Sequence, residues 1–281
     1  MKFTKMHGIG NDFVVVNGLT EVLDHGPLPE ISRRINQRKF GIGADGLILV
    51  LPSKVADYRM RMFNPDGSEA EMCGNGIRCF AKYVYDRKLI PETQFKVETL
   101  AGVKLLKLQL RSGKVEAVRV DMGIPRLLRS EIPMRGEDNG RVVNELLKVD
   151  GRRFEITAVN IGNPHAVVFE DNVVACPVSR YGPSIETHKA FPERTNVQFV
   201  QVCNPGEMIV RTWERGAGET LACGTGACAS VIASVLNDFT GRSVLAHLPG
   251  GDLRIEWMGD QRVVMTGPAE EVFEGDYPLN I

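Results

Sequence analysis

The sequence contains one unusual segment twice. Glu69-Ala-Glu-Met-Cys73-Gly-Asn-Gly recurs as Glu219-Thr-Leu-Ala-Cys223-Gly-Thr-Gly, displaced by 150 positions. Each copy has a glutamate four residues before a cysteine, then Cys-Gly-x-Gly and a run of small and apolar residues. Cys-Gly-x-Gly alone is too short to carry weight, but two long copies invite a search for the rest of a duplication.

Three further segments match in the same order and at nearly the same offset. Gly10-Asn11 and Gly162-Asn163 each precede an apolar run, residues 46–50 correspond to 196–200, and Asn64 and Glu214 each stand nine residues before their cysteine. These matches predict two similar halves related by a pseudo-twofold, each presenting one thiol. The alternative is that the halves share only a fold and the cysteines are buried core residues, as cysteines outside disulfides often are. A Gly-x-Gly turn after each cysteine argues against simple core packing.

Length and composition limit the class of protein. A chain of 281 residues, 43% hydrophobic and 25% charged, is typical of a soluble protein with two domains of ordinary size. The formal net charge is -1 and no basic tract suggests nucleic acid. No window has the length of a membrane span, and the N-terminus has no apolar run behind its charges. We therefore expect a cytoplasmic protein, or one of the plastid stroma if the chain is a mature plant form.

The six cysteines show no metal pattern. None forms Cys-x-x-Cys, and the spacings 73–79 and 223–228 do not match common zinc arrangements, so we expect no metal, with a structural zinc site as the alternative. Without a secretion signal the thiols are expected to be reduced. The cysteines outside the duplicated motif are interpreted as packing residues: Cys79, Cys176, Cys203 and Cys228.

Periodicity and turn residues predict a mixed α/β fold (α+β) with mostly antiparallel strands. In the first half we expect a strand, a turn at 7–12 and a strand at 13–17, then a helix at 28–39, strands at 47–51 and 58–63, a helix from 75 to before 91, and strands at 94–100, 103–110 and 115–122. After an irregular stretch to 147, we expect strands at 154–160 and 167–170, a helix at 181–190, strands at 196–203 and 207–214, a buried helix at 226–236, and strands to 265. The predicted domains are 1–122 together with a C-terminal return at 269–281, and 123–268.

Two thiols at Gly-rich helix starts indicate a particular chemistry. A helix N-terminus lowers a thiol pKa from its usual value of about 8.5, and converging backbone N–H groups there bind a carboxylate. If the thiols face each other across a cleft, one as thiolate removes an α-proton and the other protonates the opposite face, which is general acid–base catalysis with inversion. Without a metal or pyridoxal cofactor, helix-terminal N–H groups and exclusion of water would stabilise the carbanion.

Longer motifs resemble one known family nearly end to end. The motifs are Gly8-Ile-Gly-Asn-Asp-Phe13, Met72-Cys-Gly-Asn-Gly-Ile-Arg-Cys79, Gly162-Asn-Pro-His165, Phe191-Pro-Glu-Arg-Thr-Asn196, Glu214-Arg-Gly-Ala-Gly-Glu219 and Ala222-Cys-Gly-Thr-Gly-Ala-Cys228. With them the chain resembles the diaminopimelate epimerases, cofactor-independent enzymes of lysine and cell-wall biosynthesis. The resemblance implies two mirror-related domains, each a sheet wrapped around a central helix, with the site between them. It also implies a homodimer that interconverts LL- and meso-2,6-diaminopimelate.

The same resemblance assigns roles to individual residues. Cys73 and Cys223 correspond to the acid/base pair. Substrate-binding positions of the family correspond to Asn11, Asn64, Asn163, Asn196, Glu214 and Arg215, and helix-start amides to Gly74, Asn75, Gly224 and Thr225. His165 and Glu214 correspond to residues thought to assist near the thiols. The chain departs from some members in having Gly46 in place of glutamine and Thr225 in place of serine.

Each of these residues also has a structural interpretation. The asparagines are also turn formers, Arg215 and Glu214 could pair with each other, and His165 could be a satisfied buried histidine. Glu69 and Glu219 could brace the turns instead of touching substrate.

Two rival functions stay open at this point. The nearest is a racemase of the proline or hydroxyproline type with a similar thiol pair, which Arg215 and the several asparagines argue against, because unpaired polar groups in the pocket would penalise small substrates. The other is a redox sensor or binding protein whose thiols close into a disulfide.

Overall fold

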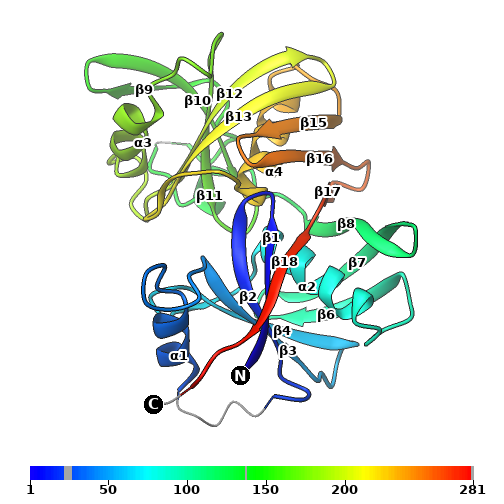
Figure 1. The fold of residues 1–281 in the computed structure, drawn as a ribbon. Coiled ribbons are helices and arrows are strands. Elements are labelled where there is room, and N and C mark those ends of the chain that lie inside the picture. Colours follow the sequence, from blue (N-terminus) through cyan, green and yellow to red (C-terminus); the bar gives the residue numbers. More distant parts are fainter. Residues whose placement is uncertain (22–26, 137, 280–281) are drawn as a thin grey trace. The chain divides into compact units, whose positions relative to one another are not determined.

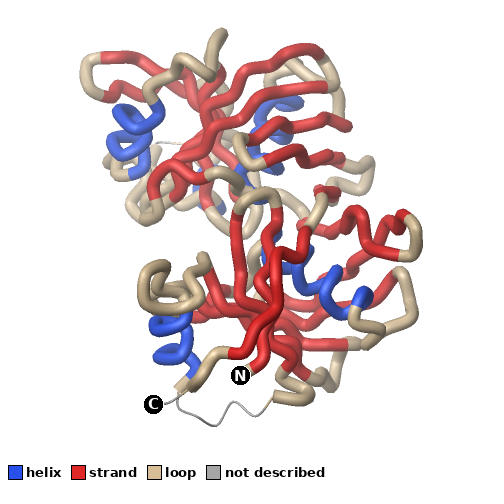
Figure 2. The backbone as a smooth tube through the Cα atoms, in the orientation of Figure 1, coloured by secondary structure: helices blue, strands red, loops and turns tan. Residues whose placement is uncertain are grey.

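The computed structural model of the chain describes residues 1–21, 27–136 and 138–279. Contacts between Cα atoms divide the chain into two compact units, one of Met1–Asp121 with Thr266–Ile281 and the other of Met122–Met265. Each unit is a mixed α/β fold in which strands predominate and helices are few (Figures 1 and 2). No helix of the described ranges is long and apolar enough to cross a membrane.

The first unit is built on one twisted series of paired strands. In space the strands follow the order β18-β1-β2-β3-β4-β6-β7-β8, in which β2–β3 and β4–β6 are parallel and the other pairs antiparallel. The short β5 forms a hairpin with β4. The bounds are β1 (Lys2–Gly8), β2 (Asn11–Asn17), β3 (Gly46–Leu51), β4 (Tyr58–Phe63), β5 (Glu69–Ala70), β6 (Gln94–Thr99), β7 (Gly102–Arg111), β8 (Lys114–Gly123) and β18 (Glu270–Asp276), with helices α1 (Leu28–Ile35) and α2 (Gly74–Asp86).

The second unit repeats this plan. Its strands pair in the order β9-β10-β11-β12-β13-β15-β16, with β11–β12 and β13–β15 parallel and β14 forming a hairpin with β13. The bounds are β9 (Glu145–Val149), β10 (Arg152–Asn160), β11 (Pro164–Phe169), β12 (Asn196–Asn204), β13 (Glu207–Glu214), β14 (Gly218–Thr220), β15 (Ser243–Leu248), β16 (Gly251–Trp257) and β17 (Val263–Gly267), with the 3₁₀ turn η1 (Arg129–Glu131) and helices α3 (Val178–Glu186) and α4 (Gly224–Leu236).

The repeat differs in the origin of one outer strand. β18 at the C-terminus pairs with β1, and in Figure 1 this red strand runs beside the blue N-terminal strand. In the second unit β9, which immediately precedes β10 in the chain, takes the corresponding place. The Met1 amino group and the Tyr277 amide each donate to the other residue's carbonyl, at 2.9 Å in both cases. The two chain ends therefore close the first unit.

One helix lies at the centre of each unit. α2 packs against β1, β2, β3 and β4, and α4 packs against β10, β11, β12 and β13. The prediction that α4 is a buried helix is confirmed, because Gly224 and every residue from Gly226 to Ser234 are buried. Its buried serines are satisfied locally, because Ser230 donates to the Gly226 carbonyl and Ser234 to the Val231 carbonyl, each at 2.8 Å.

The second helix of each unit covers the outer face of the strands. Ile31 and Ile35 of α1 pack with residues of β2 and β3 such as Val14 and Leu47. In the other unit, Tyr181 of α3 packs edge-on against Phe154 with ring centroids 5.0 Å apart. Burial of such apolar side chains is the main force that holds these helices to the strands.

Several sequence predictions need correction. The helix expected at 181–190 instead spans Val178–Glu186, because its first turn follows Pro177 at the N-cap and Pro183 is accommodated inside it. The irregular stretch before 147 contains η1, the beginning of β9 and the buried side chains of Ile132 and Val142. These local patterns were missed because the apolar residues are isolated among polar ones.

Cys203 is a second correction. The sequence interpretation as a packing residue is right for Cys79, Cys176 and Cys228, which are buried, but wrong for Cys203, which is exposed. It lies near the end of β12, where the pairing register with β13 shifts between Val202 and Asn204. A bulge of this kind turns a side chain away from the face that the strand alternation predicts.

Candidate active site

Both cysteines of the duplicated motif are the N-cap residues of the central helices. Cys73 precedes α2 with φ -133° and ψ 121°, and Cys223 precedes α4 with φ -128° and ψ 103°. The Gly76 N–H donates to the Cys73 Sγ at 3.4 Å, and the Cys223 Sγ lies 3.6 Å from the Thr225 Oγ1. The matched backbone angles place each thiol at the N-terminal end of a helix, where the backbone dipole favours negative charge.

The second glycine of each motif lets the helix start pack tightly. A Cβ on Gly226 would lie 2.8 Å from the Gln198 Nε2 and 3.2 Å from the Cys223 Sγ, and one on Gly76 would lie 3.0 Å from the Ile48 Cδ1. The second glycine of each Cys-Gly-x-Gly motif is therefore required by packing, in addition to any role in the chemistry of the thiol. At Gly46, where some members of the family have glutamine, a Cβ would lie 3.1 Å from the Met62 Cε and the Phe63 carbonyl.

The Cys223 thiol has surroundings that keep its proton. Its side chain is buried, with 4% of its surface exposed. Burial raises the pKa of Cys223 well above its ordinary value, the negative charge of Glu214 raises it further, and the Thr225 hydroxyl and the Gly226 N–H oppose the shift. Glu214 in turn accepts a hydrogen bond from the Thr220 hydroxyl at 2.6 Å. The raised pKa of Cys223 is opposite to the lowering that a helix N-terminus by itself would produce, because burial outweighs the helix-start contacts.

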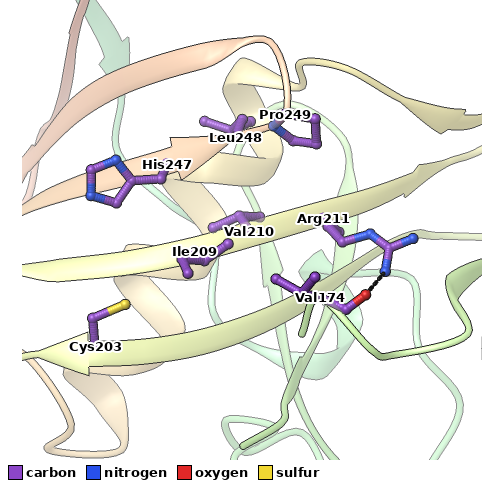
Figure 3. Close-up of a pocket in the computed structure, with 8 residues that line it drawn as sticks. All are labelled: Val174, Cys203, Ile209, Val210, Arg211, His247, Leu248 and Pro249. Carbon is purple, nitrogen blue, oxygen red and sulfur yellow. Dashed lines mark hydrogen bonds between the residues drawn. The ribbon is translucent and has the colours of Figure 1, made fainter. Parts of the chain in front are cut away.

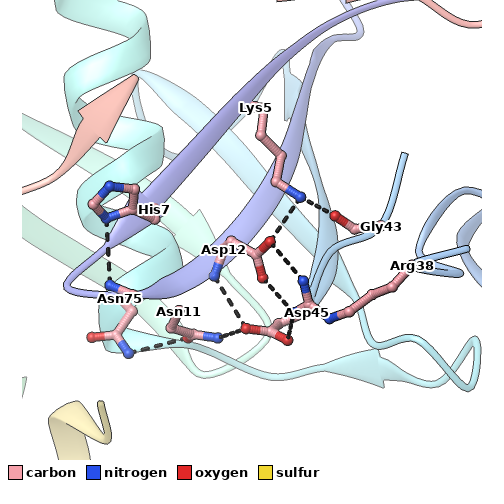
Figure 4. A network of polar contacts seen from close by, with 9 residues as sticks. Lys5, His7, Asn11, Asp12, Arg38, Gly43, Asp45 and Asn75 are labelled. Atoms are coloured by element: carbon pink, nitrogen blue, oxygen red, sulfur yellow. Dashed lines mark hydrogen bonds and ion pairs between the residues drawn. The ribbon is translucent and has the colours of Figure 1, made fainter. Parts of the chain in front are cut away.

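Asn11 and Asn75 lie beside Cys73. The Asn11 Oδ1 accepts from the Asn75 Nδ2 at 3.1 Å and from the Cys73 Sγ at 3.8 Å (Figure 4 shows the asparagines). The Asn75 Oδ1 accepts from the fully buried Arg78 at 2.9 Å. The structure thus brings three predicted site residues together at the start of α2. Gly10 precedes Asn11 with φ +87°, as Gly162 precedes Asn163 with φ +101°, so the matched asparagines follow turns of the same kind.

Asn64 follows β4 in the predicted turn. Its Nδ2 donates to the Ser68 Oγ at 2.9 Å, and its carbonyl accepts from the Ser32 Oγ at 2.9 Å. These contacts give Asn64 a turn-forming role, and its side chain is half-exposed.

His165 connects two amides inside the second unit. Its Nε2 lies 2.8 Å from the Asn163 Oδ1 and its Nδ1 lies 3.0 Å from the Gln198 Oε1. Burial lowers the pKa of His165 to about 3, and the charge of Arg215 acts in the same direction. A neutral imidazole has a single N–H, so one of the two amides must turn its NH₂ group toward the ring. Gln198 was not predicted from the sequence, where it reads as an ordinary strand residue.

Asn196 braces the end of β13. Its Nδ2 donates to the Pro164 carbonyl at 2.9 Å, and its Oδ1 accepts from the Arg215 N–H at 3.0 Å. The guanidinium of Arg215 is exposed and donates to the Glu193 carbonyl at 3.0 Å.

An ion pair braces the strand before each thiol motif. The Arg61 Nε donates to the Glu69 Oε1 at 2.7 Å, and the Arg211 Nε donates to the Glu219 Oε1 at 2.9 Å. The interpretation of both glutamates as turn braces is confirmed. Their partners were missed, although an arginine eight residues before each glutamate repeats at the same offset of 150.

Two other features of the structure do not involve the predicted residues. Within the ranges that the structure describes, no group of three or more His, Cys, Asp or Glu side chains is arranged to hold a metal ion. An apolar surface groove of the second unit (Figure 3) is lined by Val174, Cys203, Ile209, Val210, Arg211, His247, Leu248 and Pro249.

Comparison with known proteins decides the family. The family model described as diaminopimelate epimerase matches residues 3–128 and 157–272. The chain belongs to the diaminopimelate epimerase family. A diaminopimelate epimerase of Pelotomaculum thermopropionicum is 57% identical to it over 278 residues, covering 99% of each chain. One of Moorella thermoacetica is 56% identical over 281 residues, covering 100% of each.

A solved structure gives the same fold at much lower identity. A hydroxyproline epimerase from Agrobacterium vitis superposes with a TM-score of 0.71 at 16% identity, covering 98% of this chain and 91% of that one. The predicted fold class is confirmed. As a member of the diaminopimelate epimerase family the chain is an isomerase, an amino-acid epimerase, and the redox-sensor alternative is set aside as its main function.

Proposed function

We propose that the chain interconverts LL- and meso-2,6-diaminopimelate, in lysine and peptidoglycan-precursor biosynthesis, with Cys73 and Cys223 as the acid/base pair and without a cofactor. The observation that carries this proposal is that both cysteines cap the central helix of their unit at matched positions. Membership of the family supports the substrate and the reaction.

The proposed reaction moves two protons and forms no bond between sulfur and carbon. One thiolate takes the α-proton and becomes a thiol, and the electron pair of the broken C–H bond passes into the α-carboxylate. The other thiol gives its proton to the opposite face of the α-carbon and becomes a thiolate. The raised pKa of Cys223 fits the proton-donating role in one direction. In the reverse direction the roles exchange.

The helix starts supply the groups that stabilise the carbanion. The first N–H groups of a helix have no partner within the helix and attract negative charge. We assign the amides of Gly74 and Asn75 in α2, and of Gly224 and Thr225 in α4, to the carboxylate at the reacting carbon. Such preorganised donors stabilise the charge that develops during proton removal.

Polar side chains are proposed to bind the rest of the substrate. Arg215 carries the planar fork of donors that suits the distant carboxylate. The proposed substrate-binding side chains are Asn11, Asn64, Asn163, Asn196, Glu214 and Arg215, with His165 and Glu214 assisting near the thiols. A substrate that lacked the distant amino-acid group would leave these polar side chains without their partners, which favours diaminopimelate over proline-like substrates.

The first test follows hydrogen exchange during turnover. Reduced protein is incubated with LL-diaminopimelate in deuterated water, and the product is analysed by NMR and mass spectrometry. We expect the meso form with deuterium at the inverted α-carbon, and no reaction with L-proline or hydroxyproline. Absence of both inversion and exchange would overturn the proposal.

Single-cysteine variants separate the two thiols. Cys73→Ala and Cys223→Ala should each abolish inversion, because one face of the α-carbon loses its proton carrier. The remaining thiol should still exchange the α-hydrogen on its own face without inverting the centre. We therefore expect one variant to exchange only the L centre and the other only the D centre. Exchange of both centres by one variant would contradict the two-base assignment.

Assembly, location and domain structure are proposed on the same basis. Family membership supports a homodimer in the cytoplasm. We also propose that the two units are the two epimerase domains, since each carries one N-capping cysteine and one copy of the strand order.

A further inference from the structure

Asp45 holds the side-chain amide of Asn11 in one orientation (Figure 4). The Asp45 Oδ2 accepts from the Asn11 Nδ2 at 2.8 Å and from the Asp12 backbone N–H at 3.1 Å. A carboxylate can only accept hydrogen bonds, so the NH₂ group of Asn11 must face Asp45 and its oxygen must face the other way. That oxygen is the atom that lies 3.8 Å from the Cys73 Sγ.

The Asp45 carboxylate is itself held by Arg38, which also pairs with Asp12. The Arg38 Nη2 lies 2.6 Å from the Asp45 Oδ1 and 2.8 Å from the Asp12 Oδ1. From β1, the Lys5 Nζ lies 2.7 Å from the Asp12 Oδ2. Burial acts to raise the pKa of Asp12, but side-chain hydrogen bonds with Arg38, Lys5 and Asp45 outweigh it and lower the pKa to about 2. Asp12 therefore stays ionised near neutral pH, and Arg38, which both carboxylates share, keeps Asp45 in place.

Asp45 has no acidic counterpart in the second half of the chain. At the offset of 150, the counterpart of Asp45 is Thr195, whose side chain is buried and donates to a backbone carbonyl. The counterpart of Asn11 is Asn163, which contacts His165 instead. The fold can thus form this turn without an acidic residue, so the need for Asp45 is local to the first unit.

We propose that Asp45 is a positioning residue that turns the Asn11 oxygen toward the Cys73 thiol. This inference rests on the proposed catalytic role of Cys73. The S–H donates to that oxygen, which favours the thiol, while the Gly76 N–H at 3.4 Å favours the thiolate. If the amide turned over, its NH₂ group would face sulfur and both contacts would favour the thiolate. By fixing the orientation of Asn11, Asp45 thereby keeps Cys73 able to exist both as the thiol, which donates a proton, and as the thiolate, which accepts one.

The test compares the wild-type chain with Asp45→Asn. The new amide has the same shape but can donate or accept, so only the hydrogen bond from the Asn75 Nδ2 is left to orient the Asn11 amide. Alkylation of Cys73 by iodoacetamide is followed across pH by mass-spectrometric peptide mapping, together with kcat and KM for LL-diaminopimelate. We expect the alkylation midpoint to move to lower pH and kcat to fall about tenfold to a hundredfold with little change in KM. Asp45→Glu, which keeps the acceptor, should restore both in large part.

Two further variants control the result. Glu270→Gln removes a carboxylate from β18, where Glu270 lies 3.8 Å from His7, and should leave both measurements unchanged. If Asp45→Asn does not fold, Arg38→Gln is used instead, because it keeps the Asp45 carboxylate but removes the ion pair that holds it. Arg38→Gln should shift the alkylation midpoint and kcat in the same direction as Asp45→Asn, but by less. An unchanged alkylation profile, or a loss of kcat that Asp45→Glu does not rescue, would overturn the proposal. A shifted profile in a protein whose wild type does not epimerise diaminopimelate would instead refute the proposed function and leave the positioning role standing.

Discussion

At the scale of single residues, two similar backbones carry different surroundings for their thiols. Phe13 occupies the position that His165 has in the other half, and Ile48 the position of Gln198. Cys73 is half-buried beside two asparagines, whereas Cys223 is buried beside Glu214. A base and an acid need different proton affinities at the same pH, and asymmetric side chains on a repeated framework can provide them.

The buried histidine predicts a dependence of stability on pH. The pKa of His165 in the folded chain, about 3, lies below its ordinary value of 6.5, so below pH 6.5 the unfolded chain binds a proton that the folded chain does not. The contribution of neutral His165 to the unfolding free energy is therefore fully present above pH 6.5 and is lost as the pH falls toward 3. When the pH is lowered from 7 to 5, we expect the unfolding free energy of His165→Gln to fall by roughly 2 kcal/mol less than that of the wild type.

Urea denaturation at the two pH values measures this difference. The half-exposed His247, which lies beside Asp252 at the surface, provides the control, since the unfolding free energy of His247→Gln should fall by about as much as that of the wild type. Equal losses for His165→Gln and the wild type would show that the buried imidazole is not held neutral by the fold.

At the scale of elements, the close contact between each central helix and its neighbouring strand fixes the thiol. An alanine in a helix is normally about 1 kcal/mol more favourable than a glycine. Gly226→Ala should reverse this sign, because its Cβ would lie 2.8 Å from the buried Gln198 Nε2, and overpacking of this kind costs about 1–3 kcal/mol. The Cys223 Sγ, at 3.2 Å, would also move, so we expect a loss of kcat.

Thermal unfolding and steady-state kinetics of Gly226→Ala check both effects. Gly259→Ala is the control, since a Cβ there has no atom within 4 Å and should change neither stability nor kcat. A more stable, fully active Gly226→Ala protein would contradict the packing argument.

The arginine brace of the second unit predicts another loss of stability. Besides Glu219, Arg211 donates to the carbonyls of Val173, Val174 and Cys176 at 2.7–3.2 Å. A lysine has one charged nitrogen and cannot reach the same set of acceptors. Arg211→Lys should therefore lower the unfolding free energy by about 2 kcal/mol. In Arg111→Lys, whose pair with Glu116 is exposed, urea denaturation should show a change within about 0.5 kcal/mol.

At the scale of the whole chain, the first unit needs both chain ends. β18 covers the outer edge of β1, and Phe3 packs edge-on against Phe273 with ring centroids 5.9 Å apart. The second unit has its own equivalent strand, β9, inside the continuous segment Met122–Met265. Loss of the C-terminus should therefore affect the two units unequally.

Truncation after Ala269 tests this expectation. Without β18, the amides of β1 that paired with it become exposed, and we expect faster hydrogen exchange throughout β1 and β2. The amides of β12 and β13 should keep their protection. Exchange measured by mass spectrometry on proteolytic fragments distinguishes the two outcomes, and equal loss of protection in both units would contradict the assignment of β18 to the first unit alone.

The sequence by itself determined the features that depend on local pattern. The duplication, the strands around 47–51 and 58–63, the central helices and their N-terminal cysteines follow from residue periodicity and from glycines at fixed spacing. The family followed from long motifs at matched offsets, and the comparisons confirm it.

Only the tertiary structure decided which side chains meet. Asp45 holds Asn11 from 34 positions away, Gln198 contacts His165 from the neighbouring strand, and a bulge exposes Cys203. These contacts depend on strand register and on how far each turn brings distant segments together. The local sequence pattern does not specify strand register or the path of each turn. Register alone decides which side chains meet, because a shift of one residue moves every side chain to the other face of the sheet.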